Sequence, residues 1–283
     1  MQPVIGIVTQ PLSSSLMKDP QMADKTSYIM KAYVDWVESA GARVVPLIMT
    51  DDNAVTDEKL SKINGVLFPG GSGNYRDIGD YIYNKLVAEN DSGNFYPLWG
   101  TCLGFENLAR FASDSGNPLS NQASKDESLT LTFLEDPSST KMFSDATDPD
   151  YYTKEGMTFN HHMYGLSTDV FVEDKGLAAM FKPTSTSIGT VSGDTFVASM
   201  ESPDYPFFGT QFHPEKILDM YNNGSIDHSW KSVNYNRYFA DRFVEMARQN
   251  TNTCGDWSTC SVMEIDENPV YVTNTYYGNV YAW

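Results

Sequence analysis

The chain contains few cysteines and few basic residues. Only three cysteines occur among its 283 residues, which excludes a disulfide-dense scaffold. The 19 Lys and Arg residues are outnumbered by 37 Asp and Glu residues, so the formal net charge is -18 at pH 7. Because such a chain repels phosphate groups and anionic lipids, we expect neither nucleic acid nor a membrane as a partner.

Long apolar runs and groups of metal ligands are also missing. No apolar run reaches the roughly 18 to 20 residues that a membrane helix needs. The chain has four histidines, and no cysteine or carboxylate completes the ligand spacing of a metal site, so we expect no metal. The first predicted strand starts near the N-terminus, so no signal peptide is visible, and a leader removed by processing would leave the same sequence.

The pattern of the remaining residues predicts an α/β fold. Hydrophobic residues make up 41% of the chain, which is enough for one sizeable core. Apolar runs at 4–9, 43–48 and 65–68 alternate with helical patterns. This alternation predicts a mostly parallel central sheet flanked by helices on both faces.

The same patterns predict further elements along the chain. They are a helix over 28–40, a short helix capped by Thr56, late strands at 196–200 and 207–212, and a closing helix at 235–246. Between residues 113 and 159, polar loops surround one alternating strand at 129–134. This stretch is expected to be an insertion.

One cysteine lies between two glycines where an apolar run gives way to a helical pattern. The run WGTCLGFE occupies residues 99–106, and glycines on both sides of Cys102 permit a sharp turn from strand to helix. At a helix N-terminus the backbone N–H groups favour the thiolate, which is the reactive form of cysteine. Cys102 is therefore a candidate nucleophile, with a buried structural cysteine as the alternative.

A histidine follows another apolar run, in the segment GTQFHPEK at residues 209–216. Residues two apart on an extended chain point the same way, so Glu215 can orient the imidazole of His213. His213 is then a candidate general base for Cys102. Taken alone, the segment also fits a strand exit with solvated side chains.

A third segment, VLFPGGSG at residues 66–73, runs from an apolar strand into a glycine-rich turn. Such turns expose backbone N–H groups. The amides of Gly71 and of Leu103, the residue after the cysteine, can together hold the oxyanion of a tetrahedral intermediate. An ordinary turn is the alternative interpretation.

Together these segments resemble those of the gamma-glutamyl hydrolases, in the flavodoxin-like class I glutamine amidotransferase-like superfamily. The resemblance runs from residue 3 to a closing helix near residue 250. It implies a nucleophile, a base and an orienting carboxylate, and two oxyanion donors, which are Cys102, His213, Glu215, Gly71 and Leu103. It implies no cofactor.

The resemblance also indicates which residues bind substrate. Glu106 stands where glutamine-using amidotransferases usually carry Gln, which favours the hydrolase branch, and a role at the helix N-terminus is the alternative for its carboxylate. In the segment FNHHMYGLS at 159–167, Asn160 and His162 match family residues near the active site. Gly70, Glu106, Asn160 and His162 are therefore expected to contact the gamma-glutamyl head group.

The function implied is hydrolysis of gamma-glutamyl amide bonds in folate and antifolate poly-gamma-glutamates through a thioester. An anionic tail needs local cations, and Arg76, Arg110, Lys154 and Lys216 lie near the motifs. Two alternatives stay open. One is a gamma-glutamyl peptidase acting on glutathione-like peptides, and the other is a non-catalytic structural or assembly protein that retains the fold. The family resemblance also suggests a homodimer.

The resemblance ends after residue 250, which divides the chain into a hydrolase-like domain, 1–250, and a C-terminal extension, 251–283. In the extension, the spacing of Cys254 and Cys260 permits a disulfide, with two free thiols as the alternative. Asn90 and Asn223 lie in glycosylation sequons. These features and the resemblance fit a lysosomal, vacuolar or secreted protein. The tyrosine-rich tail is expected to pack as strands against the body or against a partner.

Overall fold

The computed structural model describes residues 2–218, 220–255, 260 and 263–283. The chain divides into two units, Met1–Leu98 with Ala240–Trp283, here unit 1, and Trp99–Phe239, here unit 2. Eight strands are hydrogen-bonded in the order β4-β1-β5-β6-β12-β11-β10-β8. The α/β class predicted from the sequence is confirmed. The division of the chain at residue 250 stays a prediction.

Unit 1 holds three parallel strands made of apolar residues. These are β1 (Val4–Val8), β4 (Arg43–Leu47) and β5 (Gly65–Phe68). Strands buried on both sides are continuously apolar, and every residue of β1 and β5 is buried. The helices of this unit are α1 (Lys31–Ser39), α2 (Asn53–Leu60) and the unpredicted α3 (Arg76–Asp91). The cap of α2 is Asp52, whose carboxylate accepts the Val55 N–H, and not Thr56.

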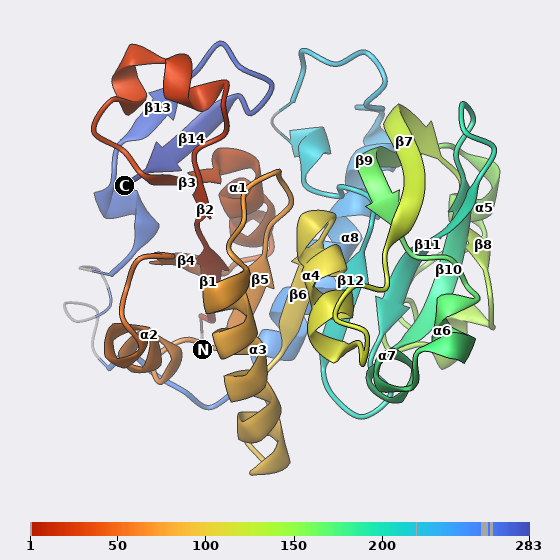
Figure 1. The fold of residues 1–283 in the computed structure, drawn as a ribbon, viewed down its shortest axis with the longest axis horizontal. Helices are drawn as coiled ribbons and strands as arrows, with labels where there is room; N and C mark the ends of the chain where they lie inside the picture. The colour runs from red at the N-terminus through yellow and green to blue at the C-terminus, as the bar shows by residue number, and fades with distance from the viewer. Residues whose placement is uncertain (1, 219, 256–259, 261–262) are drawn as a thin grey trace. The chain divides into compact units, whose positions relative to one another are not determined.

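A second sheet in unit 1 pairs the C-terminal tail with an early strand. Its order is β13 (Val270–Val272), β14 (Asn279–Ala282), β3 (Ser27–Met30) and β2 (Gln10–Pro11). In Figure 1, blue β13 and β14 lie beside red β3. The prediction of one helix over 28–40 is therefore wrong at its start, because Tyr28 pairs with Ala282 and Gln10. The tail packs as strands against its own chain. Short 3-10 turns complete the unit at Leu16–Lys18, Pro20–Met22 and Ile265–Glu267.

Unit 2 holds the antiparallel part of the main sheet. Strand β6 (Leu98–Thr101) is followed in the order by β12 (Phe207–Thr210), β11 (Thr195–Glu201), β10 (Lys182–Ile188) and β8 (Thr132–Phe133). Successive pairs from β12 to β8 are antiparallel, which makes the sheet mixed. Short helices and turns connect these strands: α5 (Tyr151–Lys154), α6 (Val170–Glu173), α7 (Lys175–Met180), Pro137–Ser139 and Lys216–Leu218.

The expected insertion forms a separate two-stranded ribbon. Strand β7 (Ser120–Leu129) pairs antiparallel with β9 (Thr158–Gly165). The prediction of a strand at 129–134 is wrong, because this stretch contains the end of β7 and the two-residue β8. The ribbon matters for function because β9 borders the candidate active site.

Aromatic side chains form the core of unit 2. Helix α8 (Trp230–Ala247) supplies Phe239, whose ring centroid lies 6.0 Å from Trp99 and 5.4 Å from Phe212. Trp99 begins unit 2 just before Cys102, and Phe212 precedes His213. This core therefore anchors both segments that carry candidate catalytic residues.

We predict that the tail strand β14 stabilises unit 1. Val280 is fully buried and pairs with Met30, so Val280→Ala should lower the free energy of unfolding by roughly 1–3 kcal/mol. Val272 lies in the same hairpin but is 69% exposed, so Val272→Ala is the matched control and should change stability by less than about 0.5 kcal/mol. Urea denaturation measures both, and equal effects would contradict the prediction.

Candidate active site

Cys102 occupies the sharp turn between β6 and helix α4 (Leu103–Ala112). Its backbone angles are φ 51° and ψ -105°, a combination that non-glycine residues rarely adopt. A Cβ added to Gly100 would lie 2.7 Å from the carbonyl carbon of Gly104. Strand and helix therefore approach each other this closely only because Gly100 has no side chain.

The Cys102 side chain is buried against neighbouring strands. Its backbone N–H donates to the Thr210 carbonyl on β12 at 2.8 Å. Its thiol donates weakly to the His161 carbonyl on β9 at 3.9 Å, and the residue is 5% exposed. Cys102 is thus attached to two backbone segments of unit 2, to β12 through its N–H and to β9 through its thiol.

His213 and Glu215 form a buried pair just beyond β12. The Nδ1 atom of His213 lies 2.7 Å from Oε1 of Glu215, and both side chains are buried. Carboxylates only accept hydrogen bonds, so Nδ1 carries the proton and Nε2 is left as the basic nitrogen. Glu215 therefore fixes the tautomer that a general base requires.

Strand β9 relates the nucleophile to the base. The His213 backbone N–H donates to the Phe159 carbonyl at 2.8 Å, while the Cys102 thiol donates to the His161 carbonyl. These two acceptors are two residues apart, or roughly 7 Å along an extended strand. Cys102 and His213 are thus attached to neighbouring points of one strand.

Burial disfavours the charged forms of Cys102 and His213. It raises the pKa of the Cys102 thiol far above its ordinary value, and Glu106 adds to this effect. The Lys216 ammonium and the Leu103 N–H lower that pKa, but they do not outweigh burial. Burial also lowers the pKa of His213. Both pKa shifts favour the uncharged forms, a thiol and a neutral imidazole, and so oppose the effect of the helix N-terminus that the sequence led us to expect.

Burial does not determine the direction of the pKa shift of Glu215, as it does for Cys102 and His213. Burial alone would raise the pKa of this carboxyl, but the His213 imidazole and its hydrogen bond hold it below the ordinary value. A carboxylate at this position stabilises positive charge on the imidazole. The dyad can therefore take up a proton from Cys102 during reaction.

Glu106 is a buried carboxyl on the first turn of α4. It accepts a hydrogen bond from Nε2 of Gln211 at 3.5 Å, and Arg110 lies 3.7 Å from its other oxygen. Burial nevertheless raises its pKa to about 7. Glu106 can therefore exchange a proton near neutral pH.

Two other predicted substrate-binding residues, Asn160 and His162, leave buried acceptor atoms without a partner. Asn160 donates to the Thr158 carbonyl at 2.7 Å, and Nδ1 of His162 lies 3.0 Å from the Tyr164 carbonyl. No hydrogen-bond partner among the described residues reaches Oδ1 of Asn160 or Nε2 of His162. Burial, together with His213, lowers the pKa of His162 to about 4. Buried polar atoms without partners are rare, and they favour a ligand site here.

Gly70 and Gly71 belong to unit 1, whereas the other predicted catalytic, oxyanion and substrate-binding residues belong to unit 2. The Gly70 N–H donates to the Tyr33 hydroxyl at 2.7 Å. Gly71 has φ +149°, which favours glycine. Leu103 opens α4, and its backbone N–H lowers the pKa of the Cys102 thiol. The oxyanion role of the two amides stays a prediction.

Several polar residues of the site were not singled out in the sequence. Gln211 bonds Glu106, and Nδ1 of His161 lies 2.9 Å from Oδ1 of Asp126. Of the proposed cations, Lys216 is buried and donates to the Met220 sulfur, whereas Lys154 has a 65% exposed side chain. A polar residue at the end of an apolar strand is the signal that could have identified Gln211.

Two further predicted features are a disulfide in the C-terminal extension and two glycosylation sequons. Cys254 and Cys260 form the expected disulfide, with 5.3 Å between their Cα atoms. The Asn90 amide donates to the Leu86 and Tyr96 carbonyls, and Asn223 donates to Asp126. Glycosylation at the two sequons stays a prediction, which intact-mass measurement would test.

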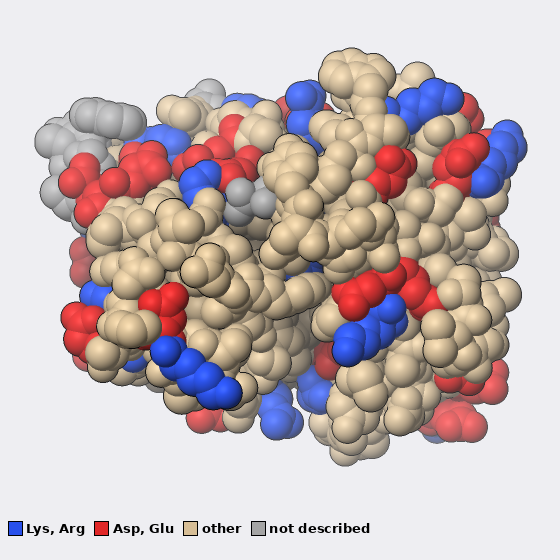
Figure 2. All heavy atoms as spheres, turned by 90° about the horizontal axis from the view of Figure 1, so that it is seen from above, with Lys and Arg blue, Asp and Glu red and all other residues tan. Residues whose placement is uncertain are grey.

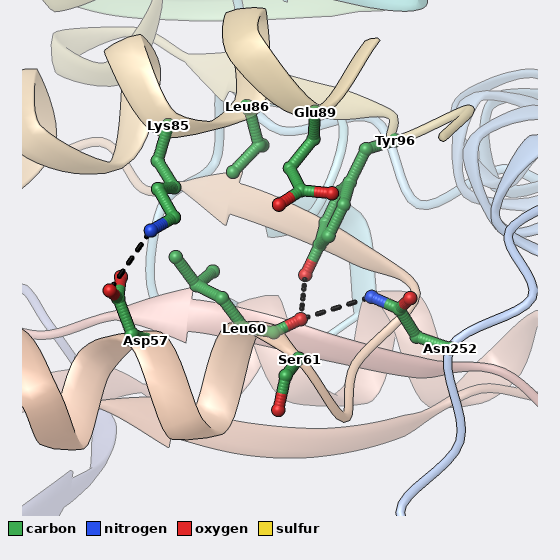
Figure 3. A pocket seen from close by; sticks show the side chains of 8 residues that line it. All are labelled: Asp57, Leu60, Ser61, Lys85, Leu86, Glu89, Tyr96 and Asn252. Atoms are coloured by element: carbon green, nitrogen blue, oxygen red, sulfur yellow. Dashed lines mark hydrogen bonds and ion pairs between the residues drawn. The ribbon is translucent and has the colours of Figure 1, made fainter. Parts of the chain in front are cut away.

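Two further features of the described residues are a cavity in unit 1 and the distribution of charged side chains on the face drawn in Figure 2. The cavity has a volume of about 240 Å³. In Figure 3, Lys85 points at Asp57, and Tyr96 and Asn252 both point at the Leu60 carbonyl. On the face drawn in Figure 2, Lys and Arg side chains form separate small groups beside Asp and Glu. The described residues include no cluster of three or more potential metal ligands, and no helix among them is long and apolar enough to cross a membrane.

The sequence is similar to known enzymes over most of its length. The family model for Glutamine amidotransferase class-I matches residues 22–230. The chain is 35% identical over 259 residues to a gamma-glutamyl hydrolase of Mus musculus, covering 89% of this chain and 79% of that protein. It is 31% identical over 263 residues to gamma-glutamyl hydrolase B of Dictyostelium discoideum, covering 90% of this chain and 74% of that protein.

The fold is similar to that of a solved glutamine amidotransferase from Methylobacillus flagellatus. The TM-score is 0.51 at 12% identity, and the match covers 91% of this chain and 98% of that one. At this identity the likeness concerns the fold alone.

We predict that Glu106 makes stability depend on pH. A carboxyl whose pKa is raised to about 7 contributes stability that is complete below its unfolded pKa and is lost as the pH rises through 7. Between pH 5 and pH 8, wild type should lose on the order of 2 kcal/mol relative to Glu106→Gln. Thermal or urea unfolding measures the difference. Glu245→Gln, at a side chain that is 69% exposed, is the control, and a similar trend there would contradict the prediction.

Proposed function

The chain belongs to the gamma-glutamyl hydrolase family, within the class I glutamine amidotransferases. We propose that it hydrolyses folate poly-gamma-glutamates with Cys102 as the nucleophile. The observation that supports this most directly is the buried His213–Glu215 pair, whose imidazole is held 2.7 Å from the carboxylate. Antifolates that carry the same tail fall in the same substrate class.

The reaction begins with a proton transfer from the Cys102 thiol to Nε2 of His213. The sulfur attacks the gamma-carbonyl carbon, and the carbonyl oxygen becomes an oxyanion held by the Leu103 and Gly71 amides. His213 then gives its proton to the leaving nitrogen, and the C–N bond breaks to leave a thioester on Cys102. A water molecule, deprotonated by His213, attacks the thioester and restores the thiol. The cycle needs no cofactor.

The head group of the substrate is assigned to the residues with buried polar atoms. Oδ1 of Asn160 and Nε2 of His162 accept N–H groups of the substrate, which removes the cost of leaving them unpaired. Glu106 and Gly70 are assigned to the same head group. Because Glu106 has a pKa of about 7, a mildly acidic medium reduces the negative charge that an anionic tail meets.

The location and assembly are proposed on the same basis. The Cys254–Cys260 disulfide supports an oxidising compartment, which for this family means the lysosome, the vacuole or the cell exterior. A homodimer is proposed from the family, and light scattering would test it.

Cys102→Ala should abolish cleavage of a pteroylpolyglutamate ladder, because removal of a nucleophile costs at least about a hundredfold in kcat. A Cys254→Ala, Cys260→Ala double variant removes the other two cysteines, and it should keep activity within threefold. Liquid chromatography of the products also reports whether cleavage is internal or terminal. Cleavage of glutathione alone would favour the peptidase, and wild type that cleaves neither substrate would favour the non-catalytic protein.

Glu215→Gln should lower kcat at least tenfold and leave KM nearly unchanged, since a neutral side chain stabilises the imidazolium less well. The carboxylate raises the pKa of His213, which burial lowers below its ordinary value. The acid limb of kcat/KM should therefore lie below pH 6.5 in wild type and move to lower pH in the variant. A limb that moves to higher pH would oppose the assigned role of Glu215.

A further inference from the structure

His228, a histidine of unit 2 that the proposed reaction does not use, contacts two backbone carbonyls. Its Nδ1 lies 2.8 Å from the Ile217 carbonyl oxygen, and its Nε2 lies 3.1 Å from that of Met220. A carbonyl oxygen only accepts hydrogen bonds, whereas a neutral imidazole has a single N–H. Both contacts are therefore hydrogen bonds only when the ring carries two N–H groups, which is the imidazolium form.

These two carbonyls lie at the end of the turn that begins at Glu215. The Leu218 N–H donates to the Glu215 carbonyl at 3.2 Å. The Met220 N–H donates to the Lys216 carbonyl at 3.1 Å. The last carbonyls of a helical turn have no partner within the turn and carry partial negative charge, which a protonated histidine can satisfy with both donors and charge. His228 is thus placed as the C-terminal cap of the turn that carries Glu215.

Groups outside the turn hold the imidazole in place. The Tyr221 ring stacks on it, with 4.3 Å between the ring centroids and 17° between the ring planes, and the face of an aromatic ring attracts a cation. Helix α8 begins at Trp230, two residues after His228, and the Val233 N–H on this helix donates to the Ser229 carbonyl at 2.9 Å. The cap therefore connects the turn to the start of a long helix.

The charged groups near the imidazole act in both directions. Lys216, which is buried in the same turn, is a cation and opposes a positive ring, whereas the carboxylate of the preceding residue, Asp227, favours one. Glu215 is bonded to His213, and Lys231 on α8 lies 4.4 Å from the centroid of a tyrosine ring. Loss of the proton acts most directly at the two carbonyls, because one of them then faces a lone pair in place of an N–H.

We propose that His228 is a positioning residue whose imidazolium caps the turn after Glu215 and so keeps Glu215 aligned with His213, an inference that rests on the proposed function. The charge of histidine ordinarily changes between pH 5 and pH 8. The cap is therefore complete in acid and loses one of its two hydrogen bonds as the pH rises. An acidic medium favours the aligned pair.

The first test compares the pH dependence of kcat in His228→Gln and His228→Arg. A carboxamide cannot span both carbonyls, whereas a guanidinium keeps its charge and several N–H groups at every pH. At pH 5, His228→Gln should lower kcat about fivefold and change KM less than twofold, because a charged cap is lost. At pH 8 it should lie within twofold of wild type, whose ring has then also lost its charge. The kcat of His228→Arg relative to wild type should rise from pH 5 to pH 8.

Asp174→Ala is the matched control for the loss of a cap. The Asp174 carboxylate caps α7 in the same unit by accepting the Leu177 N–H at 3.0 Å, and it also accepts the Ser113 hydroxyl after the C-terminal end of α4. This variant should lower the midpoint temperature of unfolding by a few degrees, as His228→Gln does at pH 5. Its kcat should stay within twofold of wild type from pH 5 to pH 8.

The second test follows the hydrogen bonds by NMR of protein labelled with nitrogen-15 histidine. At pH 5, wild type should show two slowly exchanging ring N–H signals that His228→Gln lacks, and one of them should disappear toward pH 8. The Nδ1–H of His213, which donates to Glu215, gives a further signal that is identified by its loss in His213→Ala. This signal should broaden at pH 5 in His228→Gln but not in Asp174→Ala.

The outcomes distinguish this inference from the function on which it rests. If His228→Gln and His228→Arg lower kcat by the same factor at every pH, or if His228 gives only one ring N–H signal at pH 5, the imidazolium cap is wrong. An unchanged His213 signal in His228→Gln would overturn the positioning role. Absence of cleavage by wild type would overturn the proposed function, and the two NMR signals would then decide the inference by themselves.

Discussion

The close approach of strand β6 and helix α4 is the constraint on which the rest of the site depends. A side chain at Gly100 would collide with the backbone of Gly104, and a helical backbone cannot yield as a flexible side chain does. This packing accompanies the rare conformation of Cys102, with φ 51°, in which the sulfur faces the backbone of β9 and the backbone N–H donates to β12. The position of Cys102, the proposed nucleophile, is therefore set by the main chain, and side chains tune only its protonation.

The burial that fixes these groups also keeps them neutral. It raises the pKa of Cys102 and lowers that of His213, so the uncharged forms are favoured until the thiol transfers its proton in the proposed reaction. The Glu215 carboxylate is ready to stabilise the imidazolium that forms. In a chain of net charge -18, a resting thiolate would add to the repulsion of an anionic substrate. A neutral nucleophile avoids this cost until the substrate is in place.

Local patterns predicted the parts of the structure that depend on neighbours in sequence. The apolar run of β5, the turn at Cys102 and the contact of Glu215 with His213 all follow from short spacings. Tyr28 was assigned to a helix because its strand partners lie at the far end of the chain. Strand β7, which pairs with β9, consists mostly of polar residues. It therefore lacks the alternation of apolar and polar residues by which a strand is predicted. The protonation states were also missed, because burial by distant segments determines them.

Strand β9 connects the binding of substrate to the positioning of the reacting pair. Its carbonyls at Phe159 and His161 accept hydrogen bonds from His213 and Cys102. Asn160 and His162, on the same strand, hold the buried acceptors that have no partner among the described residues. A ligand that donates to these atoms removes a desolvation cost and stiffens the strand that carries both catalytic contacts. In the proposed reaction, recognition of the head group and alignment of the Cys102 thiol with the His213 imidazole are then two effects of the same hydrogen bonds.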